Sequence, residues 1–76
     1  MKNFKKLVKK IYDQNYEVGE CFNKSITFIS FSNNTLTWQS NATGDDIKLL
    51  RDNWGIIRLF VQEIYGIETK IRKEQK

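Results

Sequence analysis

The sequence predicts a two-layer α+β domain in which helices cover one face of a three-stranded sheet. Two segments, residues 3–14 and 43–66, carry apolar side chains at the three- and four-residue spacing of amphipathic helices. Residues 25–43 contain no charged side chain and are rich in Ile, Thr, Phe and Trp, a composition typical of strands. With a short helix at residues 15–24 and a strand after residue 66, the predicted order is helix, short helix, strand, strand, long helix, strand.

Length and composition limit the possible classes of protein. The 76 residues suffice for one domain with a modest core, which we expect at residues 1–72, followed by a polar tail at 73–76. Lysine and arginine exceed aspartate and glutamate by 13 to 9, a basic bias compatible with an acidic partner or nucleic acid. No apolar run reaches the roughly 18 residues of a membrane span, and a single cysteine favours a reducing compartment. We therefore expect a cytoplasmic protein with no membrane contact.

The first helix, residues 3–14, has an apolar face that includes Phe4, Leu7 and Ile11 and a basic face opposite it. The lysines either keep a surface helix solvated or attract an acidic partner. No tryptophan or phenylalanine lies on this basic face to enter a bilayer. The lysines that are candidates for partner binding are Lys5, Lys6, Lys9 and Lys10.

The short second helix contains Gly19, which costs about 1 kcal/mol relative to alanine in a helix interior. It also contains Cys21, which has no histidine or second cysteine to work with anywhere in the chain. We therefore predict that Cys21 is a small core residue and not a nucleophile.

Asn33 and Asn34 predict a two-residue type I′ turn, because asparagine tolerates the positive φ that this turn needs. The register that follows pairs Phe31 with Leu36, Ile29 with Trp38 and Thr27 with Ser40. The apolar members of the first two pairs then share the sheet face that receives the long helix. The same register places Phe28 on the outer face.

The long helix is predicted to begin with Thr43 as a cap and with Asp45 and Asp46 in its first turn, where the helix dipole favours negative charge. Gly66 suits the position just after its end. The stripe that should cover the sheet consists of Ile47, Leu50, Trp54, Ile57, Val61 and Ile64. We expect Trp54 to be buried against the sheet together with Trp38.

The chain lacks the usual signatures of catalysis. It has no histidine, which excludes Ser-His or Cys-His nucleophiles and histidine metal sites. Neither a G-x-x-x-x-G-K-[ST] nor a G-x-G-x-x-G loop occurs, so a nucleotide-triphosphate site is not expected. The adjacent carboxylates of Asp45 and Asp46 are explained by the helix start. We therefore predict no catalytic, cofactor or metal site.

The order of elements is similar to that of KH-like folds. Residues 7–16, Phe22, residues 26–38 (ITFISFSNNTLTW) and residues 57–71 (IRLFVQEIYGIETKI) resemble the C-terminal domain of the γ/τ clamp-loader subunit of bacterial DNA polymerase III. The resemblance implies a non-enzymatic docking domain, with the ATPase modules in a preceding part of a longer protein. It also implies docking to the replicative polymerase α subunit, to the replicative helicase, or to both. The link at residues 40–46 departs from the Pro-containing link often found in this family.

Two other interpretations stay open at this point. The N-terminal domain of the bacterial replication initiator has a similar element order, but the Trp-centred motif expected near its second helix is missing around Cys21. A KH-type nucleic-acid-binding module would need a G-x-x-G loop, whereas Gly44 and Gly55 have the wrong spacing. We expect only weak, non-specific nucleic-acid binding. Besides the four lysines, the candidate docking residues are Arg51, Arg58, Leu59 and Phe28.

Overall fold

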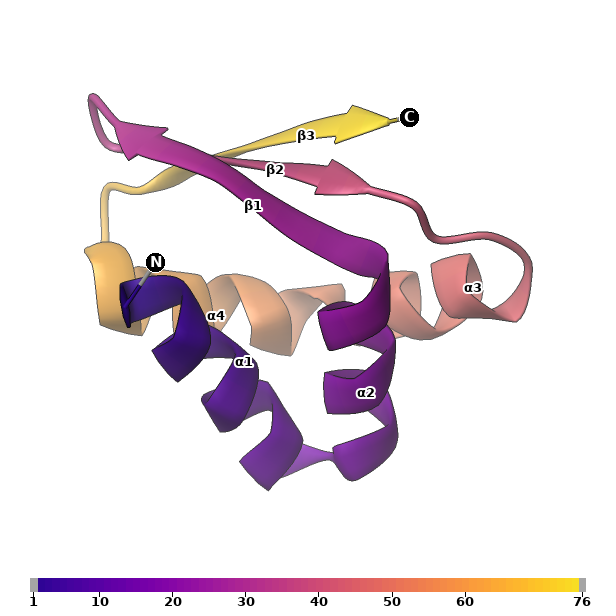
Figure 1. Cartoon of the computed structure of the whole chain (residues 1–76). Helices are drawn as coiled ribbons and strands as arrows, with labels where there is room; N and C mark the ends of the chain where they lie inside the picture. Colours follow the sequence, from indigo (N-terminus) through magenta and orange to yellow (C-terminus); the bar gives the residue numbers. More distant parts are fainter. Residues whose placement is uncertain (1, 76) are drawn as a thin grey trace.

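The chain folds into two layers, a three-stranded sheet and a layer of helices on one of its faces (Figure 1). The computed structural model describes residues 2–75. Its elements are α1 (Lys2–Gln14), α2 (Tyr16–Ser25), β1 (Ile26–Ser32), β2 (Thr35–Ser40), α3 (Asp45–Asp52), α4 (Trp54–Tyr65) and β3 (Lys70–Gln75). The predicted α+β class and the first two helices are confirmed. The KH-like arrangement stays a prediction.

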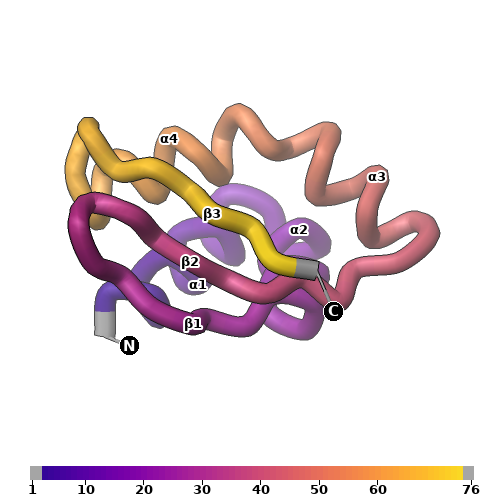
Figure 2. Tube along the Cα trace, turned by 90° about the horizontal axis from the view of Figure 1, so that it is seen from above, coloured from indigo at the N-terminus to yellow at the C-terminus, as the bar shows by residue number. Residues whose placement is uncertain are grey.

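β2 is the central strand of the sheet, as Figure 2 shows from above. It pairs antiparallel with β1 and parallel with β3, so the sheet is mixed. In this view α1 and α2 pass beneath the sheet, whereas α4 and α3 run along its β3 side (Figure 2).

The core lies between the two layers. Its largest fully buried side chain is Trp38, which is 1% exposed and meets Phe22 edge-on, with ring centroids 5.4 Å apart and planes at 89°. The buried apolar residues of the core are Phe4, Leu7, Ile11, Val18, Phe22, Ile26, Leu36, Trp38, Ile57, Phe60 and Val61. The predicted burial of Trp38 is confirmed.

The first two helices form a tight hairpin. The side chain of Asn15 accepts a hydrogen bond from the Val18 N–H at 3.3 Å and so caps the start of α2. Gly19 lies directly against Tyr12 of α1, because a Cβ at Gly19 would be 2.7 Å from the Tyr12 Cα atom. The glycine that looks costly in the sequence is what allows α1 and α2 to approach this closely.

The hairpin of β1 and β2 turns at Asn33 and Asn34, with φ values of 51° and 58°. Both residues are left-handed, as a type I′ turn requires, so the predicted turn is confirmed. The predicted pairing of Phe31 with Leu36 is also confirmed.

A β-bulge at Ile29 changes the register of the rest of the hairpin. The observed pairs there are Phe28 with Trp38, Thr27 with Gln39 and Ile26 with Ser40. The predicted pairs, Ile29 with Trp38 and Thr27 with Ser40, are wrong.

Because of the bulge, the side chains of Ile26 and Phe28 face the helices, and the side chain of Ile29 does not. Ile26 is 7% exposed, and the Phe28 ring packs against Phe4 with centroids 5.4 Å apart, whereas Ile29 is 44% exposed. Burying one more large apolar side chain stabilises the fold by about 1.5–3 kcal/mol. A disrupted ladder hydrogen bond costs only about 1 kcal/mol. The prediction that Phe28 lies on the outer sheet face is therefore wrong, and Ile29 is the exposed residue.

The predicted long helix is divided into α3 and α4 at Asn53. The Asn53 side chain donates to the Leu49 carbonyl at 2.9 Å, and its backbone N–H donates to the Leu50 carbonyl at 3.3 Å. Such local hydrogen bonds compete with the regular helical pattern. The start of α3 also differs from the prediction: the side chain of Thr43 makes no cap, and its backbone carbonyl accepts from the Asp46 N–H at 3.1 Å.

Because of this division, the apolar stripe does not cover the sheet along its full length. Ile57 and Val61 of α4 are buried, but Ile47 of α3 is 45% exposed. Trp54 is half-buried, so the prediction that it is buried like Trp38 is wrong. Its ring meets Trp38 edge-on at 5.9 Å.

β3 begins later and ends later than predicted. Gly66 has φ of 127°, and its carbonyl accepts from the Thr69 N–H at 3.1 Å, so a turn occupies the residues after α4 and leaves Ile67 82% exposed. The strand then pairs with β2 as far as Gln75 opposite Ser40. The prediction of a polar tail is therefore wrong for residues 73–75, and Lys76 lies outside the described residues.

Candidate docking groove

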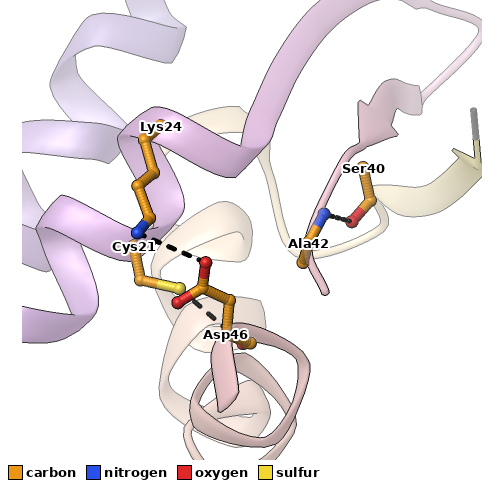
Figure 3. A network of polar contacts seen from close by, with 5 residues as sticks. All are labelled: Cys21, Lys24, Ser40, Ala42 and Asp46. Atoms are coloured by element: carbon orange, nitrogen blue, oxygen red, sulfur yellow. Dashed lines mark hydrogen bonds and ion pairs between the residues drawn. The ribbon is translucent and has the colours of Figure 1, made fainter. Parts of the chain in front are cut away.

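The buried cysteine has a structural role. Cys21 is 3% exposed, and its thiol donates to the Asp46 carbonyl oxygen at 3.7 Å. The Lys24 ammonium reaches the Asp46 carboxylate at 3.3 Å, so both contacts join α2 to α3 (Figure 3). Burial first, and Asp46 second, raise the pKa of Cys21, which keeps the thiol protonated and unreactive. The prediction that Cys21 is a core residue is confirmed.

Two features are absent from residues 2–75. No helix there is long and apolar enough to cross a membrane. No group of three or more His, Cys, Asp or Glu side chains is placed to hold a metal ion within the same residues.

The structure divides the eight predicted docking residues among several places. Lys5, Lys9 and Phe28 line one groove between α1 and β1. Arg51 lines a different pocket on the same face of the sheet, toward β3 and beside α3. The remaining four residues are Lys6 and Lys10 on α1 and Arg58 and Leu59 on α4.

The groove between α1 and β1 is open to solvent and has a volume of about 600 Å³. Its apolar surface comes from Phe4 and Val8 of α1 and from Phe28 of β1. Phe28 reaches the groove because the bulge at Ile29 turns it inward. Lys5, Lys9 and Asp13 border this apolar surface, so its charged lining has an excess of one positive charge. One surface thus combines cations with apolar side chains, as a site for an amphipathic ligand requires.

The groove lies next to a free strand edge. β1 is an outer strand, and its residues 26–32 carry no charge, so its unpaired N–H and C=O groups are open to another strand. The other edge strand, β3, carries charge at Lys70, Arg72, Lys73 and Glu74, and charge protects an edge from pairing. Of the two edges, β1 is the better template for an added strand.

The lysines of α1 differ in whether their charge is already paired with another residue of the chain. Lys10 contacts Glu63 of α4 at 3.0 Å and lies 5.1 Å from the centre of the Phe60 ring, so its charge already has partners on α4. Lys9 contacts Asp13 at 3.4 Å, but both side chains are largely exposed and such a pair is weak. Lys5 is exposed and has no ion pair within residues 2–75. The groove therefore retains positive charge for a partner.

Arg58 and Leu59 lie on the outer side of α4. Arg58 is exposed, and Leu59 is 47% exposed. Their predicted position away from the core is confirmed, whereas their role in docking stays a prediction. The helical spacing of the sequence predicts that both residues are exposed. No sequence pattern predicts the α1–β1 groove, because the groove forms only when the bulge at Ile29 turns Phe28 inward.

Comparisons of the chain with protein-family models, with curated proteins and with solved structures found no match.

Proposed function

We propose that this chain is a non-enzymatic docking domain that binds an extended, acidic segment of a partner protein along the α1–β1 groove. The observation that carries the proposal is the uncharged, unpaired edge of β1 beside an apolar groove bordered by Lys5 and Lys9. A segment that adds to β1 as a further strand would obtain affinity from main-chain hydrogen bonds. Its alternate side chains would meet Phe4, Val8 and Phe28.

The charges on the groove favour an acidic segment over a neutral one. Lys5 and Lys9 lie at the rim and stay hydrated, so they accelerate encounter more than they tighten the final complex. The groove borders only residues 26–28 of β1, and the bulge at Ile29 interrupts the strand just after them, so we expect the added strand to be short.

The resemblance to the clamp-loader γ/τ subunit names the first partners to test, which are the replicative polymerase α subunit and the replicative helicase. This assignment implies a bacterial replication protein in the cytoplasm. The docking chemistry of the groove does not depend on it.

The first test reverses the charge of the groove. We expect Lys5→Glu combined with Lys9→Glu to weaken binding of the polymerase α subunit or the helicase by about tenfold at low salt, which corresponds to about 1.4 kcal/mol. The loss should appear mainly in the association rate and should shrink as salt screens the charges. Surface plasmon resonance at several salt concentrations measures both quantities.

The matched control is Lys6→Glu combined with Lys48→Glu, which changes the net charge equally at exposed positions outside the groove. We expect it to bind nearly as the parent does. A partner that binds the groove variant normally, but loses affinity with Arg58→Ala and Leu59→Ala, would move the docking site to α4. Sub-micromolar, sequence-dependent binding of DNA or RNA at physiological salt would instead make the chain a nucleic-acid module.

A further inference from the structure

A second cavity, separate from the α1–β1 groove, lies where α3 and α4 meet the sheet near the end of β2. Its volume is about 490 Å³, which is in the usual range for ligand pockets. Its walls include Trp38 of β2, Ile47 and Leu50 of α3 and Trp54 of α4. The division at Asn53 helps to create it, because none of the residues of α3 is fully buried and its apolar side chains face the cavity without closing it.

Two cations border this apolar cavity. Lys73 pairs with Trp38 in the sheet register, so its side chain projects from the inner, helix-facing side of β3. Its ammonium lies 4.3 Å from the centre of the Trp54 ring. Arg51 of α3 also lines the cavity and is exposed. Neither cation has an ion pair with any residue of the described chain, 2–75. Residues on the inner face of a sheet are usually apolar, and folding does not require a lysine beside this open apolar cavity. The position of Lys73 therefore suggests a role in binding.

We infer that this cavity, called here the Trp54 pocket, is a binding site for an acidic peptide segment that inserts one large apolar side chain. The apolar side chain contacts Leu50 and Trp54, and neighbouring carboxylates of the peptide pair with Arg51 and Lys73. Arg51 can hold a carboxylate through two parallel hydrogen bonds. The Lys73 ammonium lies beside the Trp54 ring and still has N–H donors for a second carboxylate.

The aromatic geometry favours a peptide over a nucleic acid. Single-stranded nucleic acids bind by stacking bases on free aromatic faces. In the Trp54 pocket the Trp38 ring is 1% exposed, and Trp54 has Lys73 over its ring and Trp38 edge-on against it. The cavity therefore offers apolar volume and positive charge but little open ring surface.

The test uses a capped acidic peptide with one central phenylalanine flanked by aspartates, added to the full chain. Two-dimensional NMR should show the indole N–H signal of Trp54 moving with saturation, while the backbone amide signals of Thr27 and Phe28 in the α1–β1 groove stay in place. Peptides with serine in place of the phenylalanine, or with lysines in place of the aspartates, should bind at least about tenfold more weakly, since each removes one of the two recognised features.

Two variants of the protein have matched controls. Lys73→Gln and Arg51→Gln should each weaken peptide binding about fivefold or more, because each removes one of the two charges that pair with the peptide carboxylates. Lys70→Gln, on the outer face of the same strand, and Arg58→Gln, on α4, should leave binding unchanged. All four positions are exposed, so circular dichroism should show that every variant is folded.

The peptide experiment tests the Trp54 pocket separately from the α1–β1 groove. The variant with Lys5→Glu and Lys9→Glu should still bind this peptide at the Trp54 pocket. Equal binding by the parent, Lys73→Gln and Arg51→Gln would overturn the inference. Equal binding of the aspartate and lysine peptides would also overturn it. A Trp54 signal that responds to an oligothymidine strand more strongly than to the peptide would replace it with a nucleic-acid site.

Discussion

Gly19→Ala is expected to destabilise the domain by about 2 kcal/mol or more, even though alanine is the better helix former. A Cβ at this position would lie 2.6 Å from Cγ and 2.7 Å from Cα of Tyr12. The clash with the Tyr12 backbone is decisive, because a side chain could rotate away but the backbone of α1 could not. The helix propensity gain of about 1 kcal/mol is smaller than the cost of separating α1 from α2, which overpacking places at about 1–3 kcal/mol or above.

Gly55→Ala is the control for this prediction. Gly55 lies in α4, and a Cβ there would meet nothing within 4 Å. Alanine should therefore stabilise α4 by up to about 1 kcal/mol. Thermal unfolding measures both variants, with about 4–8 °C expected for each kcal/mol in a domain of this size. A Gly19→Ala protein that melts at or above the parent's temperature would refute the close packing of α1 on α2.

Trp38→Ala is expected to cost about 3–5 kcal/mol, which is a large part of the stability of a small domain. Trp38 is 1% exposed and touches Phe22 from α2 and Trp54 from α4, so its loss opens a cavity between the sheet and two helices. Urea unfolding followed by circular dichroism gives the change in the free energy of unfolding.

Two comparisons make the Trp38 prediction specific. The indole N–H of Trp38 is buried and has no hydrogen-bond acceptor within residues 2–75, so Trp38→Phe removes an unsatisfied donor as well as volume. We expect Trp38→Phe to be milder than Trp38→Ala by at least about 1 kcal/mol. Trp54→Ala should also be milder than Trp38→Ala, because Trp54 is only half-buried. Equal losses for the alanine variants would contradict the observed difference in burial.

The features that the sequence predicted correctly are those specified by neighbouring residues. The helices predicted at residues 3–14 and 15–24 lie within one residue of the observed ends of α1 and α2, and Asn33 with Asn34 specified the type I′ turn. Features that depend on distant contacts were missed. The bulge at Ile29 is favoured by the burial of Phe28 against Phe4, a contact between β1 and α1 that no local pattern contains.

The same contrast between local patterns and distant contacts applies to the candidate sites. Lys5 and Lys9 were found from the basic face of the first helix, and Phe28 was found too but assigned to the wrong face of the sheet. Lys73 was missed, because residues 73–76 look like a charged tail when their pairing with β2 is unknown. The Trp54 pocket depends on the break at Asn53, where a side-chain hydrogen bond competes with a helical period that otherwise continues.

The parallel pairing of β2 with β3 also implies an order of assembly. β1 and β2 close through a two-residue turn at little cost in chain entropy, whereas β3 reaches β2 only after the whole α3–α4 segment has folded back. Apart from the half-buried Ile71, the described side chains of β3 are exposed, so little apolar burial holds this strand in place. We infer that β3 is the last strand to dock and the first to open. Amide hydrogen exchange should then be faster in residues 70–75 than in the β1–β2 hairpin, and equal rates would show that all three strands open as one cooperative unit.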